Sequence, residues 1–194
     1  MVRQHFTDPA WGDPIDVPSV LSAIPSDAAL AGMYFLALLD GAKRRGLVLP
    51  GLRDRYLPFS FYPVTEFAPV LVAAAERFYP ERSLRQALRA IGCAGPLVFL
   101  ESTLGKVTLG STVGPQAAVA AIAKSYPLNL RSSRCAVTEV SPNSCRVALH
   151  DIPYFLDSHH VGVFEGTLAY VGVAGRVRIA SHSPVSADLL LEWS

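Results

Sequence analysis

The spacing of apolar residues changes near residue 133, from a helical period before that point to an alternating one after it. Residues 144–150 alternate between apolar side chains and polar or small ones, as a strand with one buried face does. Residues 176–180 and 186–193 alternate in the same way. The C-terminal third of the chain therefore predicts a twisted antiparallel sheet of about four strands.

Two proline-containing turns divide these strands into hairpins. Ser141-Pro142-Asn143 directly precedes residues 144–150, and Ser183-Pro184 lies between residues 176–180 and 186–193; both have the composition of tight turns. Between the hairpins, the apolar positions from Val161 to Val171 recur at helical spacing. We therefore expect two hairpins separated by a crossing helix.

The first two thirds of the chain predict helices. Apolar residues recur there every three to four positions, and Asp27, Thr65 and Ser83 are typical residues of a helix start. The expected helices cover about 27–46, 65–78, 83–92, 96–109 and 115–126, with Gly92 ending the third. Helices followed by two hairpins are typical of an α+β fold, here an N-terminal helical layer packed on the sheet.

Residues 1–19 predict an irregular arm, and residues 20–194 a single domain. The arm contains several prolines and Trp11, and we interpret it as a simple extension. The alternative is that it packs across the domain through Phe6 and Trp11. With 51% hydrophobic residues the chain can bury a large core without disulfides, and the apolar surplus favours a homodimer or a ligand cavity.

Charge and cysteine content indicate which partners and which cellular compartment to expect. The 17 Lys and Arg residues nearly balance the 16 Asp and Glu residues, and the longest basic run, residues 43–45, falls at a predicted helix end, so nucleic acid is not an expected partner. The three cysteines lack C-x-x-C spacing, which favours a reducing compartment. Met1 to Pro18 does not resemble a signal peptide, and no apolar run predicts a membrane span. We expect a cytoplasmic protein.

A histidine-rich segment is the main candidate for metal chemistry. Asp157, Ser158, His159 and His160 are consecutive, and His150, Asp151 and His182 lie elsewhere in the same third of the chain. Imidazole and carboxylate groups bind zinc or iron when three or four of them converge. Adjacent residues on a helix diverge by about 100°, however. We therefore expect no metal, and interpret Asp157 or Ser158 as a helix cap with both histidines in an exposed first turn.

Nucleophilic catalysis has weaker support. Ser158, His182 and Asp151 could be combined into a triad, but the chain has no G-x-S-x-G motif to expose the serine. Cys93 follows Gly92 at a predicted helix end, where the helix dipole raises the pKa of a thiol, so we interpret it as a small buried residue. The segment 110–115 could offer backbone N–H groups to an anion, but it lacks the P-loop pattern and is better explained by helix capping.

Aromatic residues are the best candidates for a binding site. They lie on predicted helical faces that could border an apolar cavity, although such faces also form ordinary core. The expected ligand-binding residues are Tyr34, Phe67, Phe78, Tyr154, Phe155, Phe164 and Tyr170, together with His159 and His160.

Five short segments resemble a known family. They are Phe61-Tyr62-Pro63, residues 87–92 (ALRAIG), residues 102–106 (STLGK), residues 162–168 (GVFEGTL) and Leu191-Glu192-Trp193. In this order and spacing they resemble the large myxobacterial paralogous family of unknown function, whose domain is similar in shape to haem-NO-binding, 4-vinyl-reductase-type and TRAPP-type domains. The resemblance extends from about Val17 to the C-terminus.

The resemblance implies helices on an antiparallel sheet, frequent pairing into dimers, and a cavity between helices and sheet that holds haem or small hydrophobic effectors in relatives. This chain lacks the Tyr-x-Ser-x-Arg motif of the haem binders and the cysteine pair of the vinyl-reductase-type domains, so no cofactor is expected. We expect a non-enzymatic sensory or carrier module for a small apolar ligand. A protein-interaction adaptor dimer is the second hypothesis, and a metal-dependent or hydrolytic enzyme the third.

Overall fold

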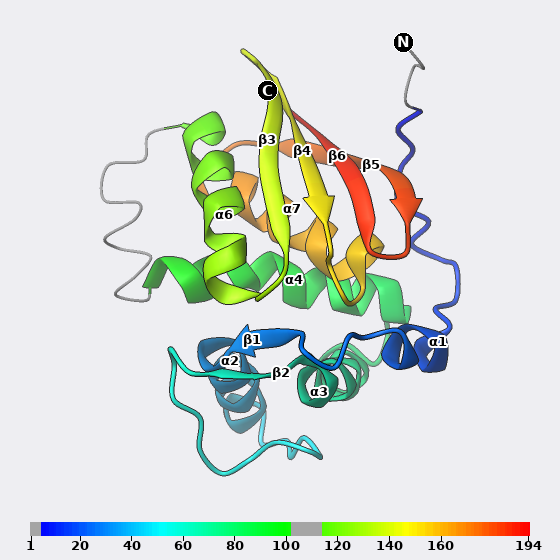
Figure 1. Cartoon of the computed structure of the whole chain (residues 1–194), viewed down its shortest axis with the longest axis vertical. Helices are drawn as coiled ribbons and strands as arrows, with labels where there is room; N and C mark the ends of the chain where they lie inside the picture. The colour runs from blue at the N-terminus through cyan, green and yellow to red at the C-terminus, as the bar shows by residue number, and fades with distance from the viewer. Residues whose placement is uncertain (1–4, 102–113) are drawn as a thin grey trace.

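An antiparallel sheet forms one side of the molecule, with strand order β3–β4–β6–β5 (Figure 1). The computed structural model describes residues 5–101 and 114–194. The strands are β3 (Arg134–Ser141), β4 (Ser144–His150), β5 (Gly175–Ser183) and β6 (Ser186–Trp193). The predicted hairpins, turns and α+β class are confirmed, because the alternating residues do have one buried and one outward face, with Val147 and Leu189 fully buried.

Helices cover the buried face of the sheet. α6 (Pro115–Asn129) packs against β3, and α7 (Val161–Tyr170) packs under β5 and β6. α7 is the predicted crossing helix between the hairpins. A single wide turn, η1 (Leu156–His160), with π-type hydrogen bonding, leads directly into α7. α4 (Leu84–Glu101) lies beneath these elements, and in Figure 1 it separates them from the remaining helices.

The N-terminal half forms a second body on the far side of α4 (Figure 1). It contains α1 (Val17–Ser22), α2 (Gly32–Arg44), α3 (Val64–Phe78) and the short strands β1 (Ala29–Ala31) and β2 (Phe61–Pro63). The predicted start of the first long helix at Asp27 is wrong, because residues 29–31 pair with residues 61–63 before α2 begins at Gly32.

α4 and α7 cross at very short range, because both carry glycine where they touch. A Cβ atom placed on Gly92 would lie 2.0 Å from the carbonyl oxygen of His159, and one on Gly162 would lie 2.2 Å from that of Arg89. Gly166 approaches Cys93 in the same way. Gly162 and Gly166 thus permit close packing of α7 against α4 of the same chain.

Two helices run past their predicted ends. Gly92 does not end α4, which continues through Pro96 to Glu101, because the glycine makes room for the η1 backbone and Phe99 beyond it is buried in the core. α6 likewise continues through Pro127 to Asn129. The motif at residues 102–106, the rest of the predicted 96–109 helix and most of the 110–115 turn lie outside the described residues.

The N-terminal arm contacts both the sheet and α4, which contradicts its interpretation as a simple extension. Thr7 pairs with Ile179 on the edge of β5, and Trp11 stacks on Arg89 of α4 with its ring centroid 4.4 Å from the guanidinium carbon. Ser83 also donates a hydrogen bond to the Trp11 carbonyl at 2.6 Å. Within the described parts of the chain, every helix is too short or too polar to cross a membrane.

Candidate functional site

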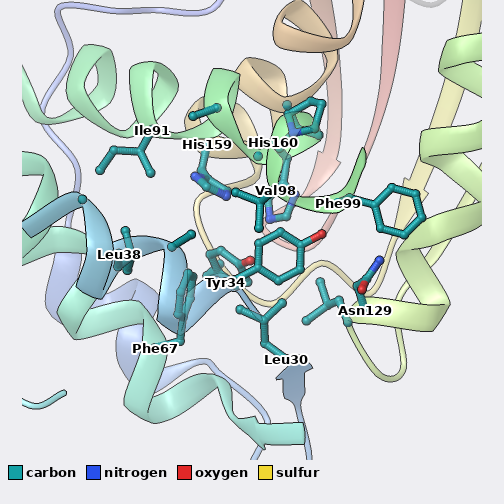
Figure 2. Close-up of a pocket in the computed structure, with 18 of the residues that line it drawn as sticks. Leu30, Tyr34, Leu38, Phe67, Ile91, Val98, Phe99, Asn129, His159 and His160 are labelled. Carbon is teal, nitrogen blue, oxygen red and sulfur yellow. The ribbon is translucent and has the colours of Figure 1, made fainter. Parts of the chain in front are cut away.

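A cavity of about 220 Å³ lies where the N-terminal body meets α4, α6 and η1 (Figure 2). In Figure 2 the histidines enter from one side, Leu30 and Phe67 close the opposite side, and Tyr34 lies between them. Most of the wall is aliphatic or aromatic. It includes Leu30, Leu38, Phe67, Phe78, Ile91, Val98, Phe99, Ile122, Leu130 and Val163. The cavity is therefore apolar, with a small number of polar groups. None of its lining residues belongs to β3, β4, β5 or β6, so it does not lie between the helices and the sheet as expected.

His159 and His160 both border this cavity, and both are more than nine-tenths buried. They are brought there by η1, which follows a left-handed Phe155 with φ of 39° and is held against α4 at Gly92. The expectation of an exposed first turn is therefore wrong. A π-type turn is wider than an α-helical one, and such turns are frequent at functional sites.

Burial keeps both imidazoles neutral. It lowers the pKa of His159 to about 4, although a hydrogen bond to the Leu88 backbone acts in the opposite direction. Burial also holds the pKa of His160 well below its usual range, and the neighbouring His159 adds to this effect. At neutral pH the cavity thus presents two uncharged rings, 5.1 Å apart between centroids and nearly perpendicular.

Part of the hydrogen-bonding capacity of these polar side chains is unused. His160 Nδ1 lies 3.0 Å from the Tyr126 hydroxyl, and Asn129 Nδ2 donates to the Ser125 carbonyl at 2.9 Å. Among the described residues, His159 Nδ1, His160 Nε2 and Asn129 Oδ1 are buried without a hydrogen-bond partner. Buried polar atoms are paired in the great majority of cases, so three unpaired ones around one cavity point to a missing partner.

Three buried tyrosines of the cavity remain protonated. Burial raises the pKa of the Tyr34, Tyr126 and Tyr154 hydroxyls above their usual value. Tyr154 also stands against His160, with 4.9 Å between ring centroids. These hydroxyls supply neutral donors and acceptors, and no described side chain on the inner wall is charged.

The mouth of the cavity lies between the end of α2 and the middle of α4. Arg44, Arg45 and Ala94 are the exposed residues of its lining. The guanidinium of Arg45 stacks on Phe78 at 4.5 Å and donates to the Gly41 carbonyl at 3.1 Å. The cations are thus held at the rim, and a ligand would pass beside Arg45 to reach the histidines.

Six of the nine expected site residues line this cavity: Tyr34, Phe67, Phe78, Tyr154, His159 and His160. The structure places Phe155 and Phe164 in the surrounding core, where Phe164 stacks on Tyr126. Tyr170 is exposed and borders a separate groove between α4 and α7. Sequence reasoning missed Tyr126 and Asn129, because α6 is rich in alanine and lacks a clear apolar face that would mark its inner side.

The remaining histidines and carboxylates do not converge here. Asp157 pairs with Arg85, Asp151 with Arg134 at 2.8 Å, and His182 with Asp188 at 2.9 Å. Ser158 donates to the carbonyl of Phe155 at 3.4 Å. Within 5–101 and 114–194, no three His, Cys, Asp or Glu side chains gather as metal ligands would. The hypothetical triad of Ser158, His182 and Asp151 is therefore not assembled.

Cys93 lies in the middle of α4, not at a helix end. Its Sγ is 4.0 Å from Glu165 Oε2, and burial raises the pKa of the thiol to about 11. Such a thiol stays protonated at neutral pH and is a poor nucleophile.

The arrangement of helices and sheet defines the class of fold: it is that of the H-NOX domains. The chain matches a mutant of the T. tengcongensis H-NOX protein with a TM-score of 0.65 at 10% identity, over 85% of this chain and 98% of that chain. It matches the Fe(II) unliganded H-NOX protein of K. algicida with a TM-score of 0.61 at 13% identity, over 85% and 97%. The S. oneidensis H-NOX protein in its Fe(II)NO ligation state gives 0.61 at 10% identity, over 85% and 99%.

The chain belongs to the family described as Protein of unknown function (DUF2378), whose model matches residues 23–194. The comparison with curated proteins finds no match. The resemblance to a family of unknown function, related in fold to haem-NO-binding domains, is thereby confirmed.

Haem does not fit the cavity. His159 Nδ1 or His160 Nε2 could supply an axial nitrogen, since both are unpaired and border the cavity. However, the cavity measures about 220 Å³, and a protein cavity of roughly 150 Å³ is filled by a single benzene ring. A porphyrin with four pyrrole rings and two propionates is several times larger. Figure 2 shows the side chains of Tyr34 and Val98 lying between the histidines and Leu30.

Proposed function

We propose that this domain is a non-enzymatic sensory or carrier module that binds a small, largely apolar molecule in the cavity between α2, α3, α4, α6 and η1. The expected ligand-binding residues that line the cavity are Tyr34, Phe67, Phe78, Tyr154, His159 and His160. The module acts in the cytoplasm, and its three cysteines, which are free thiols, are consistent with a reducing compartment.

One observation carries this proposal: unpaired, neutral polar atoms border an otherwise apolar cavity that opens beside Arg45. These atoms favour occupation of the cavity by a molecule with a hydrogen-bonding group, because an unpaired buried polar group destabilises the fold by about 1–3 kcal/mol. Small-molecule sites have the character seen here, with apolar walls and a few placed polar groups.

Native mass spectrometry of freshly purified protein tests the proposal. We expect a fraction of the protein to carry an extra mass of an organic molecule, which is lost on denaturation, and an absorption spectrum without a haem band. Ala37 lines the cavity, so the ring introduced by Ala37→Phe should occupy part of that space and reduce the retained fraction. Ala169→Phe, on the exposed surface of α7, is the matched control and should retain the ligand.

A protein free of any ligand in every preparation, and unable to take up small aromatic compounds, would contradict the proposal. Equal retention in Ala37→Phe and in the parent protein would show that the molecule binds elsewhere.

A protein-interaction adaptor is the second candidate, favoured by the groove between α4 and α7. Leu97 and Tyr170 border this groove and are about half exposed, at 45% and 54%. Large exposed apolar side chains at one groove are typical of interaction sites, and a homodimer is the simplest use of such a surface. Light scattering of the protein and of Leu97→Ser/Tyr170→Ser tests this: a dimer that dissociates in the variant supports it, and a monomer at all concentrations contradicts it.

A further inference from the structure

The hydrogen-bonding pattern of the cavity indicates which chemical group its ligand carries. Three atoms around the cavity lack a partner among the described residues: His159 Nδ1, His160 Nε2 and Asn129 Oδ1. Whether each is a donor or an acceptor follows from the partner of the other polar atom in the same side chain.

The ring nitrogen of His159 that borders the cavity, Nδ1, is unprotonated. Its ring makes a hydrogen bond to the Leu88 backbone that favours the protonated form, as a bond donated by the ring to a carbonyl does. Since Nδ1 has no partner, the donating atom is Nε2. A neutral imidazole has one N–H, so Nδ1 carries a lone pair and is an acceptor.

The same reasoning applies to His160. Its ring makes a hydrogen bond of the same kind to the Tyr154 backbone, while Nε2 has no partner. The N–H is therefore on Nδ1, which also faces the Tyr126 oxygen at 3.0 Å. The lone pair of Nε2 is left unpaired.

Asn129 adds a third acceptor. Its Nδ2 donates to the Ser125 carbonyl at 2.9 Å, which fixes the amide and leaves Oδ1 without a partner. All three unpaired atoms are thus acceptors, and they lie in a cavity whose inner wall carries no charge. A cation would lose its hydration without gaining a carboxylate, and an anion would meet lone pairs.

We propose that the ligand is a neutral molecule of one or two rings that carries a hydroxyl or N–H donor, which binds His159 Nδ1, His160 Nε2 or Asn129 Oδ1. This inference rests on the proposed function and narrows it to a class of ligand. A hydroxyl suits the cavity best, because it donates to an acceptor and can accept from the Tyr34 hydroxyl that lines the same space. The volume of about 220 Å³ sets the size limit.

Isothermal titration with three matched probes tests the inference: p-cresol, p-xylene and p-toluate. p-Cresol and p-xylene have nearly the same shape and differ in the donor, and p-toluate replaces it with a charge. We expect p-cresol to bind roughly tenfold more tightly than p-xylene, as one hydrogen bond to an otherwise unpaired acceptor would give. p-Toluate should bind more weakly than either.

The possible failures are distinct. If p-xylene binds as tightly as p-cresol, the donor inference is overturned and the apolar cavity stands as a site. If p-toluate binds as tightly as p-cresol, the inference of a neutral ligand is overturned. If no probe binds at millimolar concentration, both the inference and the proposed function are overturned.

Variants identify the acceptor. The measured quantity is the ratio of p-cresol to p-xylene affinity, because a general change in cavity shape affects both probes. We expect the ratio to fall towards one in at least one of His159→Phe, His160→Phe and Asn129→Leu, and to stay unchanged in Tyr170→Ala, which lies outside the cavity. Asn129→Leu keeps the test valid if a histidine variant does not fold. A ratio unchanged in all three overturns the assignment.

Discussion

The two cavity histidines are adjacent in sequence, yet the protein holds both uncharged and buried. That state depends on their burial, and it links the stability of the fold to pH. In the folded protein His159 has a pKa of about 4, and in the unfolded chain its pKa returns to about 6.5. Below the pKa of His159 in the unfolded chain, the unfolded chain binds a proton that the folded protein does not bind. The stability of the fold therefore falls as the pH falls.

The free energy of unfolding should therefore decrease between pH 6.5 and pH 4. His159 alone accounts for about 3 kcal/mol over this window, and His160 acts in the same direction. Urea unfolding at a series of pH values measures the effect. His159→Gln cannot titrate and retains an N–H for Leu88, so its stability should depend less on pH. An equally steep loss in this variant would show that other groups cause it.

At the scale of elements, the crossing of α4 and α7 positions the site. Gly92 and Gly162 let the two backbones touch, and this contact sets where η1 places His159 and His160. The sequence indicated the crossing helix, but it could not show that Gly92 lies within a helix. A glycine after an apolar run is typical of a helix end, and only the approach of the η1 backbone explains it here.

Replacing Gly162 with alanine should destabilise the protein by about 3 kcal/mol, because the new methyl group would overlap the Arg89 carbonyl and the helices would have to separate. Chemical denaturation measures this change. Gly12→Ala is the matched control, since nothing lies within 4 Å of a Cβ there, and its stability should change by less than about 0.5 kcal/mol. Similar stabilities for the two variants would contradict the close crossing.

At the scale of the whole molecule, the arm packs against both the sheet and α4. Trp11 covers Arg89 while Thr7 extends the sheet at Ile179. Trp11→Ala should lower the free energy of unfolding by about 1–2 kcal/mol, through lost packing and the lost cation–π contact. Urea denaturation of this variant beside Phe59→Ala, an exposed aromatic, measures the difference. Equal stabilities would mean that the arm does not stabilise the folded domain.

The sheet was predictable from sequence because its strands are half buried, which gives a strict alternation such as that of residues 144–150. β1 and β2 were not predictable, since strands of three residues are too short to show an alternation of apolar and polar residues. The site was only partly predictable. Aromatic residues on helical faces indicated most of its wall, whereas the burial of both histidines depends on the left-handed Phe155 and the wide turn after it. No residue type marks that geometry.

The most direct test of the account is a titration of isotope-labelled protein with p-cresol, followed by amide and imidazole NMR signals. A ligand in the proposed cavity should shift the signals of Tyr34, His159, His160 and Asn129, and the shifts should saturate at one site. Shifts confined to Tyr170 and Leu97 in the groove between α4 and α7, or none at saturating p-cresol, would contradict the claim that this cavity binds a small molecule.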